Sequence, residues 1–189
     1  MRLFLAINLD PTVRRAIVEA AAPLRAAAPS LGWVDDSRLH LTLKFLGDTT
    51  DDRVPPLCQA MNDVAGRHRP FAMHIRETGA FPNFRRARVV WMGIEREPRL
   101  ELLHHDVELA TEALGFEVEG RAFRPHLTLA RVRERTALEE LRQLARASRT
   151  VRFEEESAVG SIDLMRSNRG SNSTAPRYEC LHAAPLRHN

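Results

Sequence analysis

The 189-residue sequence is poor in cysteine and in long apolar runs, and each shortage excludes a class of protein. The two cysteines, Cys58 and Cys180, are too few for a disulfide framework and lack metal-site spacing, so we interpret them as free thiols in a reducing cytoplasm. No apolar run approaches the roughly 20 residues that are needed to cross a bilayer. The opening MRLFLAINLD has neither the apolar length nor the cleavage site of a signal peptide. We therefore expect a cytoplasmic protein without a membrane anchor.

Lysine is also nearly absent, since Lys44 is the single lysine among 28 lysine and arginine residues, and the net charge is only +3. The guanidinium group of arginine is a planar fork that pairs with phosphate, which suits an anionic substrate. Codon composition explains most of these arginines equally well. A hydrophobic content of 43% fits one globular domain, residues 1–189, that buries a sizeable core.

Strand-like and helix-like patterns alternate along the whole chain. Alternating apolar residues predict strands over residues 3–7, 33–34, 40–46, 71–77, 87–94, 123–132, 151–158, 161–167 and 175–183. Helical periodicity predicts helices over 11–28, bent or ended by Pro23, and over 51–68, 98–114 and 137–147, with Thr49 or Thr50 capping the second. Residues 79–86, GAFPNFRR, are predicted to form a loop. Because strand, helix, strand, helix, strand recurs in both halves, we predict an α+β fold with two related, pseudo-symmetric lobes.

The tetrapeptide HLTL occurs twice, over residues 40–43 and again over 126–129, and each copy lies within a predicted strand. Successive side chains of a strand point to opposite faces, so His40 shares a face with Thr42, and His126 shares a face with Thr128. The leucines take the other face. One such histidine is readily explained as a half-buried residue bonded to a neighbouring strand. That explanation does not account for the matching threonine.

Two imidazoles can also bind zinc, but no third ligand accompanies either motif, so we expect no metal. The adjacent His104 and His105 lie in a predicted helix, where neighbours do not share a face. The remaining arrangement is two imidazoles facing each other across a groove between the lobes, each beside a hydroxyl group. Phosphoryl transfer at an RNA 2′ or 3′ oxygen needs these groups, because one imidazole accepts a proton, the other donates one, and the hydroxyls bind phosphate oxygens. This chemistry requires no cofactor.

Several stretches together carry a family resemblance. The paired HLTL motifs, the opening RLFLAI, the KFLG after the first motif, the central RVVWMGI and the RPHLTLAR of the second motif resemble the two-histidine (2H) phosphoesterases. Within this superfamily the chain is similar to the bacterial and archaeal RNA 2′,3′-cyclic phosphodiesterases, also called 2′-5′ RNA ligases. The resemblance extends in order and spacing from about Arg2 through Ser167.

The resemblance implies a bilobal fold with two antiparallel sheets, helices on the outside and a central cleft that holds both motifs. It implies hydrolysis of RNA 2′,3′-cyclic phosphate ends to 2′-phosphomonoesters, and a reversible, ATP-independent joining of RNA ends through a 2′-5′ bond. It further implies that His126 activates water and that His40 protonates the departing 3′ oxygen, although both imidazoles are chemically able to do either. We expect a monomer whose partners are RNA termini.

Two arginines are further candidates. Arg131 resembles a phosphate-contacting arginine of the family, but strict alternation places it on the face opposite His126 unless a bulge or strand twist intervenes. Arg124 shares the parity of His126 and is either an RNA contact or a solvated residue at the rim.

The aromatic residues divide into two groups. Phe81 and Phe84 lie in the predicted loop next to Arg85 and Arg86, where they can stack on RNA bases. Packing in the core is the favoured role of the other candidates, Phe45, Trp33 and Trp91.

Two rival functions stay open at this point. The first is a 2H enzyme that acts on a small cyclic nucleotide, such as an ADP-ribose cyclic phosphate. The second is a non-catalytic ligand-binding or RNA-binding module of the same fold. Binding alone does not need two proton carriers, which argues against the second.

Overall fold

The computed structural model describes residues 1–134, 136–168 and 177–187. Its strands are β1 (Arg2–Asn8), β2 (Gly32–Trp33), β3 (His40–Asp48), β4 (Phe71–Phe81), β5 (Val89–Ile94), β6 (His126–Arg131), β7 (Glu154–Val159), β8 (Ser161–Asn168) and β9 (Arg177–Pro185). The α-helices are α1 (Pro11–Ala20), α2 (Ala22–Ala27), α3 (Val54–Ala65), α4 (Pro98–Ala113) and α5 (Leu138–Ser148). Three short 3-10 helices are η1 (Asp36–Arg38), η2 (Asp51–Arg53) and η3 (Phe84–Arg86).

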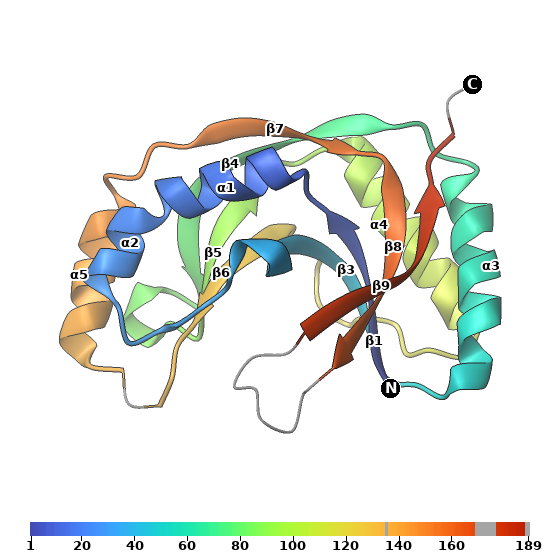
Figure 1. Cartoon of the computed structure of the whole chain (residues 1–189), viewed down its shortest axis with the longest axis horizontal. Helices are drawn as coiled ribbons and strands as arrows, with labels where there is room; N and C mark the ends of the chain where they lie inside the picture. Colours follow the sequence, from blue (N-terminus) through green and yellow to red (C-terminus); the bar gives the residue numbers. More distant parts are fainter. Residues whose placement is uncertain (135, 169–176, 188–189) are drawn as a thin grey trace.

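The strands form one curled antiparallel sheet with two halves. The strand order is β7-β4-β5-β6-β3-β1-β8-β9, and β2 pairs with β6. We call β7-β4-β5-β6 the β6 half and β3-β1-β8-β9 the β3 half. The halves meet where Leu41 of β3 pairs with Leu127 of β6. Helices lie outside the curl, with α1, α2 and α5 towards one end and α3 and α4 towards the other (Figure 1).

The α+β class, the antiparallel pairing and the outer helices are confirmed. The two sheets that the resemblance implied are joined into one through the β3–β6 pair. The halves also differ from the expected division along the sequence, because the C-terminal strands β8 and β9 return to pair beside β1. Residues 175–176 of the last predicted strand lie outside the described residues.

The predicted helices form where their apolar faces meet the sheet. Ile17 of α1 and Leu24 of α2 are fully buried, as are Leu100, Leu103 and Val107 of α4. Asp10 caps α1 by accepting a hydrogen bond from the Thr12 N–H, and Pro11 occupies the first turn, where it displaces no helical hydrogen bond. The predicted break occurs, since α1 ends at Ala20 and α2 starts at Ala22 with a proline in its first turn.

Some local predictions are wrong. The Thr50 side chain makes no capping hydrogen bond, and the chain enters α3 through η2. The predicted loop over residues 79–86 is shorter, because β4 continues to Phe81.

Of the two free cysteines, Cys58 is half-buried and Cys180 is exposed. Within the described ranges no helix is both long and apolar enough to span a bilayer.

Candidate active site

The two HLTL motifs lie side by side at the junction of the two halves. Each motif starts its strand, and the Leu41–Leu127 pair is antiparallel. The same register puts Thr42 across from His126 and His40 across from Thr128. Residues directly opposite in a sheet project from the same face, so the two histidines and two threonines share one face. All four are half-buried, while the intervening leucines are buried on the core side.

Both imidazoles are held in the same way. His40 Nδ1 donates to the carbonyl oxygen of Arg38 at 2.8 Å, and His126 Nδ1 donates to that of Arg124 at 2.7 Å. Because a carbonyl only accepts, each Nδ1 carries a hydrogen and each Nε2 is left for chemistry. His40 Nε2 lies 3.1 Å from the Thr42 hydroxyl, which can donate to it when the imidazole is neutral.

The surroundings favour the neutral form of both histidines. Burial lowers the pKa of His40, the hydrogen bond to the Arg38 carbonyl partly offsets this, and the positive charge of Arg131 lowers it further. The pKa of His126 is lowered by the same causes, with the Arg124 carbonyl opposing them. Arg131 is thus near enough to act on both rings.

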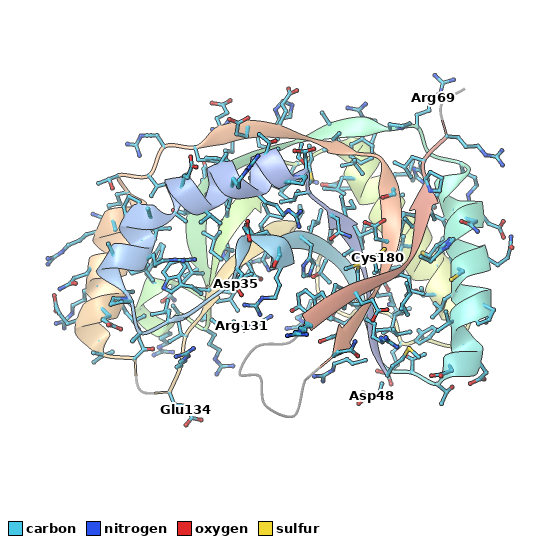
Figure 2. The ribbon with its side chains drawn as sticks, viewed as in Figure 1. Asp35, Asp48, Arg69, Arg131, Glu134 and Cys180 are labelled. Carbon is cyan, nitrogen blue, oxygen red and sulfur yellow. The ribbon has the colours of Figure 1, made fainter. Side chains whose placement is uncertain are left out.

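A β-bulge brings Arg131 to the reactive face. Ala130 pairs with Val90 of β5, but Thr128 pairs with the next residue, Trp91, so Leu129 is an extra residue on β6. One extra residue reverses the alternation, and Arg131 therefore shares the face of His126. Figure 2 shows Arg131 in the middle of the molecule, between the two halves. The bulge that the Arg131 prediction required is present.

The first motif has an equivalent bulge. In the pairing of β1 with β3, Leu5 pairs with Lys44 and Ala6 pairs with Thr42, which leaves Leu43 as the extra residue. Phe45 is therefore turned to the face of His40 and is 68% exposed. The favoured core role of Phe45 is wrong, because the strict alternation behind it stops at Leu43.

The same bulge turns Lys44, the single lysine, into the core. Its Nζ lies 2.6 Å from Glu108 Oε2 of α4 and donates to the Glu117 carbonyl at 2.7 Å. Glu108 Oε2 also accepts from the Glu119 N–H at 3.2 Å. This ion pair ties β3 to α4 and to the segment that leads to His126, so it fixes both motifs to one support.

Of the remaining predicted site residues, two lie next to His126 and one does not. The Phe81 ring makes an edge contact with His126, at 4.9 Å between centroids, and Arg124 is exposed beside it. Both line a pocket next to His126. Phe84, by contrast, packs against the core, where η3 contacts α5.

Trp91 is a residue that the sequence interpretation missed. It is half-buried and lines the same pocket, although a core role was favoured for it. The available signal was a glycine within a predicted strand, Gly93, because such a glycine often marks a close approach. Among the described residues no group of three or more His, Cys, Asp and Glu side chains could hold a metal ion.

Comparisons with known proteins agree with this geometry. A family model described as LigT-like phosphoesterase matches residues 7–91 and 93–175. A Geobacillus stearothermophilus protein named RNA 2′,3′-cyclic phosphodiesterase is 34% identical over 186 residues, which is 97% of this chain and 56% of that protein. This chain belongs to the LigT-like phosphoesterase family. A Thermus thermophilus relative of the same name is 39% identical over 138 residues, covering 69% of this chain and 68% of the relative.

Solved structures of LigT-like phosphoesterases share the fold. The crystal structure of TT0787 from Thermus thermophilus has a TM-score of 0.78 at 31% identity and covers 99% of this chain and 98% of that one. E. coli LigT complexed with 3′-AMP has a TM-score of 0.74 at 27% identity, with the same coverage.

Proposed function

We propose that this protein hydrolyses RNA 2′,3′-cyclic phosphate ends to 2′-phosphomonoesters by metal-independent acid–base catalysis. The observation that carries the proposal is the pair of imidazoles on one face, each with Nδ1 tied to a carbonyl and Nε2 left for proton transfer. The named activity of the family relatives supports the choice of substrate. A protein that only bound RNA would have no use for two matched proton carriers.

The reaction needs a base that takes a proton from the attacking water and an acid that gives a proton to the leaving oxygen. One neutral Nε2 removes a proton from water as the water oxygen bonds to phosphorus. The other imidazole, in its protonated form, donates to the 3′ oxygen as the P–O3′ bond breaks. The phosphate stays on the 2′ oxygen. Following the resemblance, we assign water activation to His126 and protonation of the leaving oxygen to His40.

The neighbouring groups would stabilise the negative charge that grows on phosphate. The Thr42 and Thr128 hydroxyls share the face of the histidines and can donate to the non-bridging oxygens. Arg131 adds a guanidinium group that the bulge turns to the same face. The same five groups would also catalyse 2′-5′ joining, since a 5′-hydroxyl can replace water as the nucleophile without ATP.

The test is product analysis with EDTA-treated protein. We expect an oligonucleotide with a 2′,3′-cyclic phosphate end to be converted to the 2′-phosphomonoester, and a strand with a free 5′-hydroxyl to be joined to it at high concentration. ADP-ribose cyclic phosphate, assayed in parallel, should be the poorer substrate. A loss of activity that zinc or manganese restores would overturn the metal-independent mechanism. We also propose that the protein acts in the cytoplasm and that it is a monomer. Light scattering of the purified protein tests the oligomeric state.

A further inference from the structure

The segment that leads into the second motif forms neither helix nor strand. It covers residues 116–125, between α4 and β6 (Figure 1), and residues 117–122 are all exposed. Its last part nevertheless carries the anchor of His126, because the Arg124 carbonyl accepts the hydrogen bond from His126 Nδ1. The Ile94 N–H donates to the Pro125 carbonyl at 3.3 Å, which attaches the end of the segment to β5. The position of the residues before Pro125 therefore depends on side-chain contacts.

The anchor of His40 is supported in another way. The Arg38 carbonyl, which accepts from His40 Nδ1, belongs to the last residue of η1. The N–H of Leu39 donates to the Asp36 carbonyl at 3.0 Å and closes this turn. A hydrogen-bonded turn thus holds the anchor of His40, whereas the anchor of His126 needs a contact from outside its own segment.

His104 of α4 supplies such a contact. Its imidazole lies flat against the Phe123 ring, with the centroids 3.8 Å apart and the planes inclined by 10°. Phe123 directly precedes Arg124 and is the first half-buried residue after the exposed stretch 117–122. Its side chain also packs against the hydrophobic core. The segment therefore returns to the body of the protein at this stack, one residue before the carbonyl that holds His126.

The surroundings of His104 keep its ring neutral. Burial lowers the pKa of His104, and the carboxylate of Glu108 opposes this effect. The charges of Lys44 and His105 lower the pKa further, while a backbone hydrogen bond to Leu43 raises it. His104 Nε2 lies 3.8 Å from Glu108 Oε1, which is too far for a hydrogen bond. The neutral ring therefore reaches the last residue of the first motif, Leu43, as well as the segment before the second.

Two successive turns of α4 hold the segment at two places. His104 and Glu108 are four residues apart, so they share one face of the helix. Glu108 Oε2 accepts from the Glu119 N–H at 3.2 Å near the start of the exposed stretch, and His104 meets Phe123 at its end. The next residue of the helix, His105, is exposed. It provides a matched control, since it is the same side chain on another face of α4.

We propose that His104 is a positioning residue for His126. Its stack on Phe123 keeps the carbonyl of the next residue in line with His126 Nδ1. The proposal rests on the proposed function for its kinetic consequence, because a fixed Nδ1–H leaves Nε2 free for proton transfer. Without the stack, the carbonyl can move and His126 can take its other tautomer. His40 keeps its own anchor in η1.

Nitrogen-15 NMR of the imidazoles in the whole protein tests the positioning without turnover. At slightly alkaline pH we expect both His40 and His126 of the wild type to carry their hydrogen on Nδ1. His104→Ala should shift the signals of His126 towards the other tautomer and leave those of His40 in place. His104→Phe, which keeps a flat ring on Phe123, should restore the wild-type pattern, and His105→Ala should change neither histidine. Unchanged His126 signals in His104→Ala, or equal changes at both histidines, would overturn the proposal.

Turnover of an oligonucleotide with a 2′,3′-cyclic phosphate end should follow the same order. His104→Ala should lower kcat by about 10-fold to 100-fold, since a misplacement of roughly 1 Å can cost this much. KM should stay within about two-fold, because the stack does not touch the substrate. His104→Phe should regain most of the lost turnover, and His105→Ala should lose none. A loss in His105→Ala as large as that in His104→Ala would contradict the assignment.

A double-mutant cycle shows whether the effect passes through the stack. Phe123→Leu keeps the apolar bulk and removes the flat ring, so it should lower kcat as His104→Ala does, and it serves as the test where His104→Ala does not fold. The double variant should be no slower than either single variant, because both remove the same contact. Additive losses would contradict the proposal. If the wild-type protein hydrolyses no cyclic phosphate, the proposed function fails, while the tautomer measurement still decides the role of His104.

Discussion

The two halves of the sheet carry the same tetrapeptide and support it in the same way, yet they surround it with different side chains. Each histidine donates Nδ1 to the carbonyl two residues earlier, and each motif ends in a bulge at its second leucine, Leu43 or Leu129. Beyond that bulge the halves diverge. The residue turned to the reactive face is Phe45 in the β3 half and Arg131 in the β6 half.

The next strands differ as well. Thr42 pairs with Ala6 of β1, whereas Thr128 pairs with Trp91 of β5. Ala6 belongs to a small apolar cluster with Phe4 and Met165, and the Phe4 ring lies beside His40, with 5.0 Å between the ring centroids. In the β6 half the corresponding space is the pocket. The backbone therefore duplicates the positions of the proton carriers, and the side chains around them make the two halves unequal.

The largest effect should follow removal of either imidazole. We expect His40→Ala and His126→Ala each to lower kcat by about 100-fold or more, since general acid–base catalysis contributes roughly 10²–10⁴-fold. The measurement is hydrolysis of an oligonucleotide with a 2′,3′-cyclic phosphate end. Wild-type turnover in both variants would show that the two imidazoles have no role in proton transfer.

The residue that follows each bulge is buried, but it is the charged Lys44 in the β3 half and Ala130 in the β6 half. Lys44→Met leaves Glu108 as an uncompensated buried charge, which should cost about 3–5 kcal/mol in the free energy of unfolding. The double variant with Glu108→Leu should recover most of the loss. Urea unfolding measures both, and a Lys44→Met variant as stable as wild type would contradict the structural role of the ion pair.

The threonines should give a smaller and symmetrical effect. Thr42→Val and Thr128→Val keep the branched shape and remove only the hydroxyl, so each should lower kcat/KM by about 10-fold to 150-fold, equivalent to roughly 1.5–3 kcal/mol. Serine at either position should retain most activity. If valine is harmless at both positions while folding is intact, the threonines serve the strand alone.

The smallest effect should separate Arg131 from Phe45. Arg131→Gln removes a positive charge that lowers the pKa of both histidines, so both pKa values should rise and the acidic limb of the kcat/KM profile should move to higher pH. Because Arg131 is exposed, the rate should fall only about 10-fold. Phe45→Leu, the matched change in the other half, should leave the limbs in place. A shift in Phe45→Leu but not in Arg131→Gln would reverse the comparison.

Sequence periodicity predicted most elements because amphipathic strands and helices repeat over several residues. The prediction failed where one extra residue in a strand reverses the alternation of side chains between the two faces of the sheet. Strict alternation put Phe45 and Arg131 on the wrong faces, since a bulge leaves no mark in a pattern of period two. An aromatic residue in a strand resembles core, so Trp91 was assigned there. The return of β8 to β1 joins residues about 160 positions apart along the chain, and no local pattern encodes such a pairing.

The central claim is that two equally supported histidines divide the acid and base roles, and leaving-group rescue tests it most directly. The acid matters less when the leaving oxygen is already a weak base. We expect a nitrophenyl phosphodiester to restore turnover in His40→Ala relative to wild type and to leave His126→Ala impaired. Rescue of His126→Ala alone would exchange the two roles, and equal impairment of both variants with natural and activated substrates would contradict the division of labour.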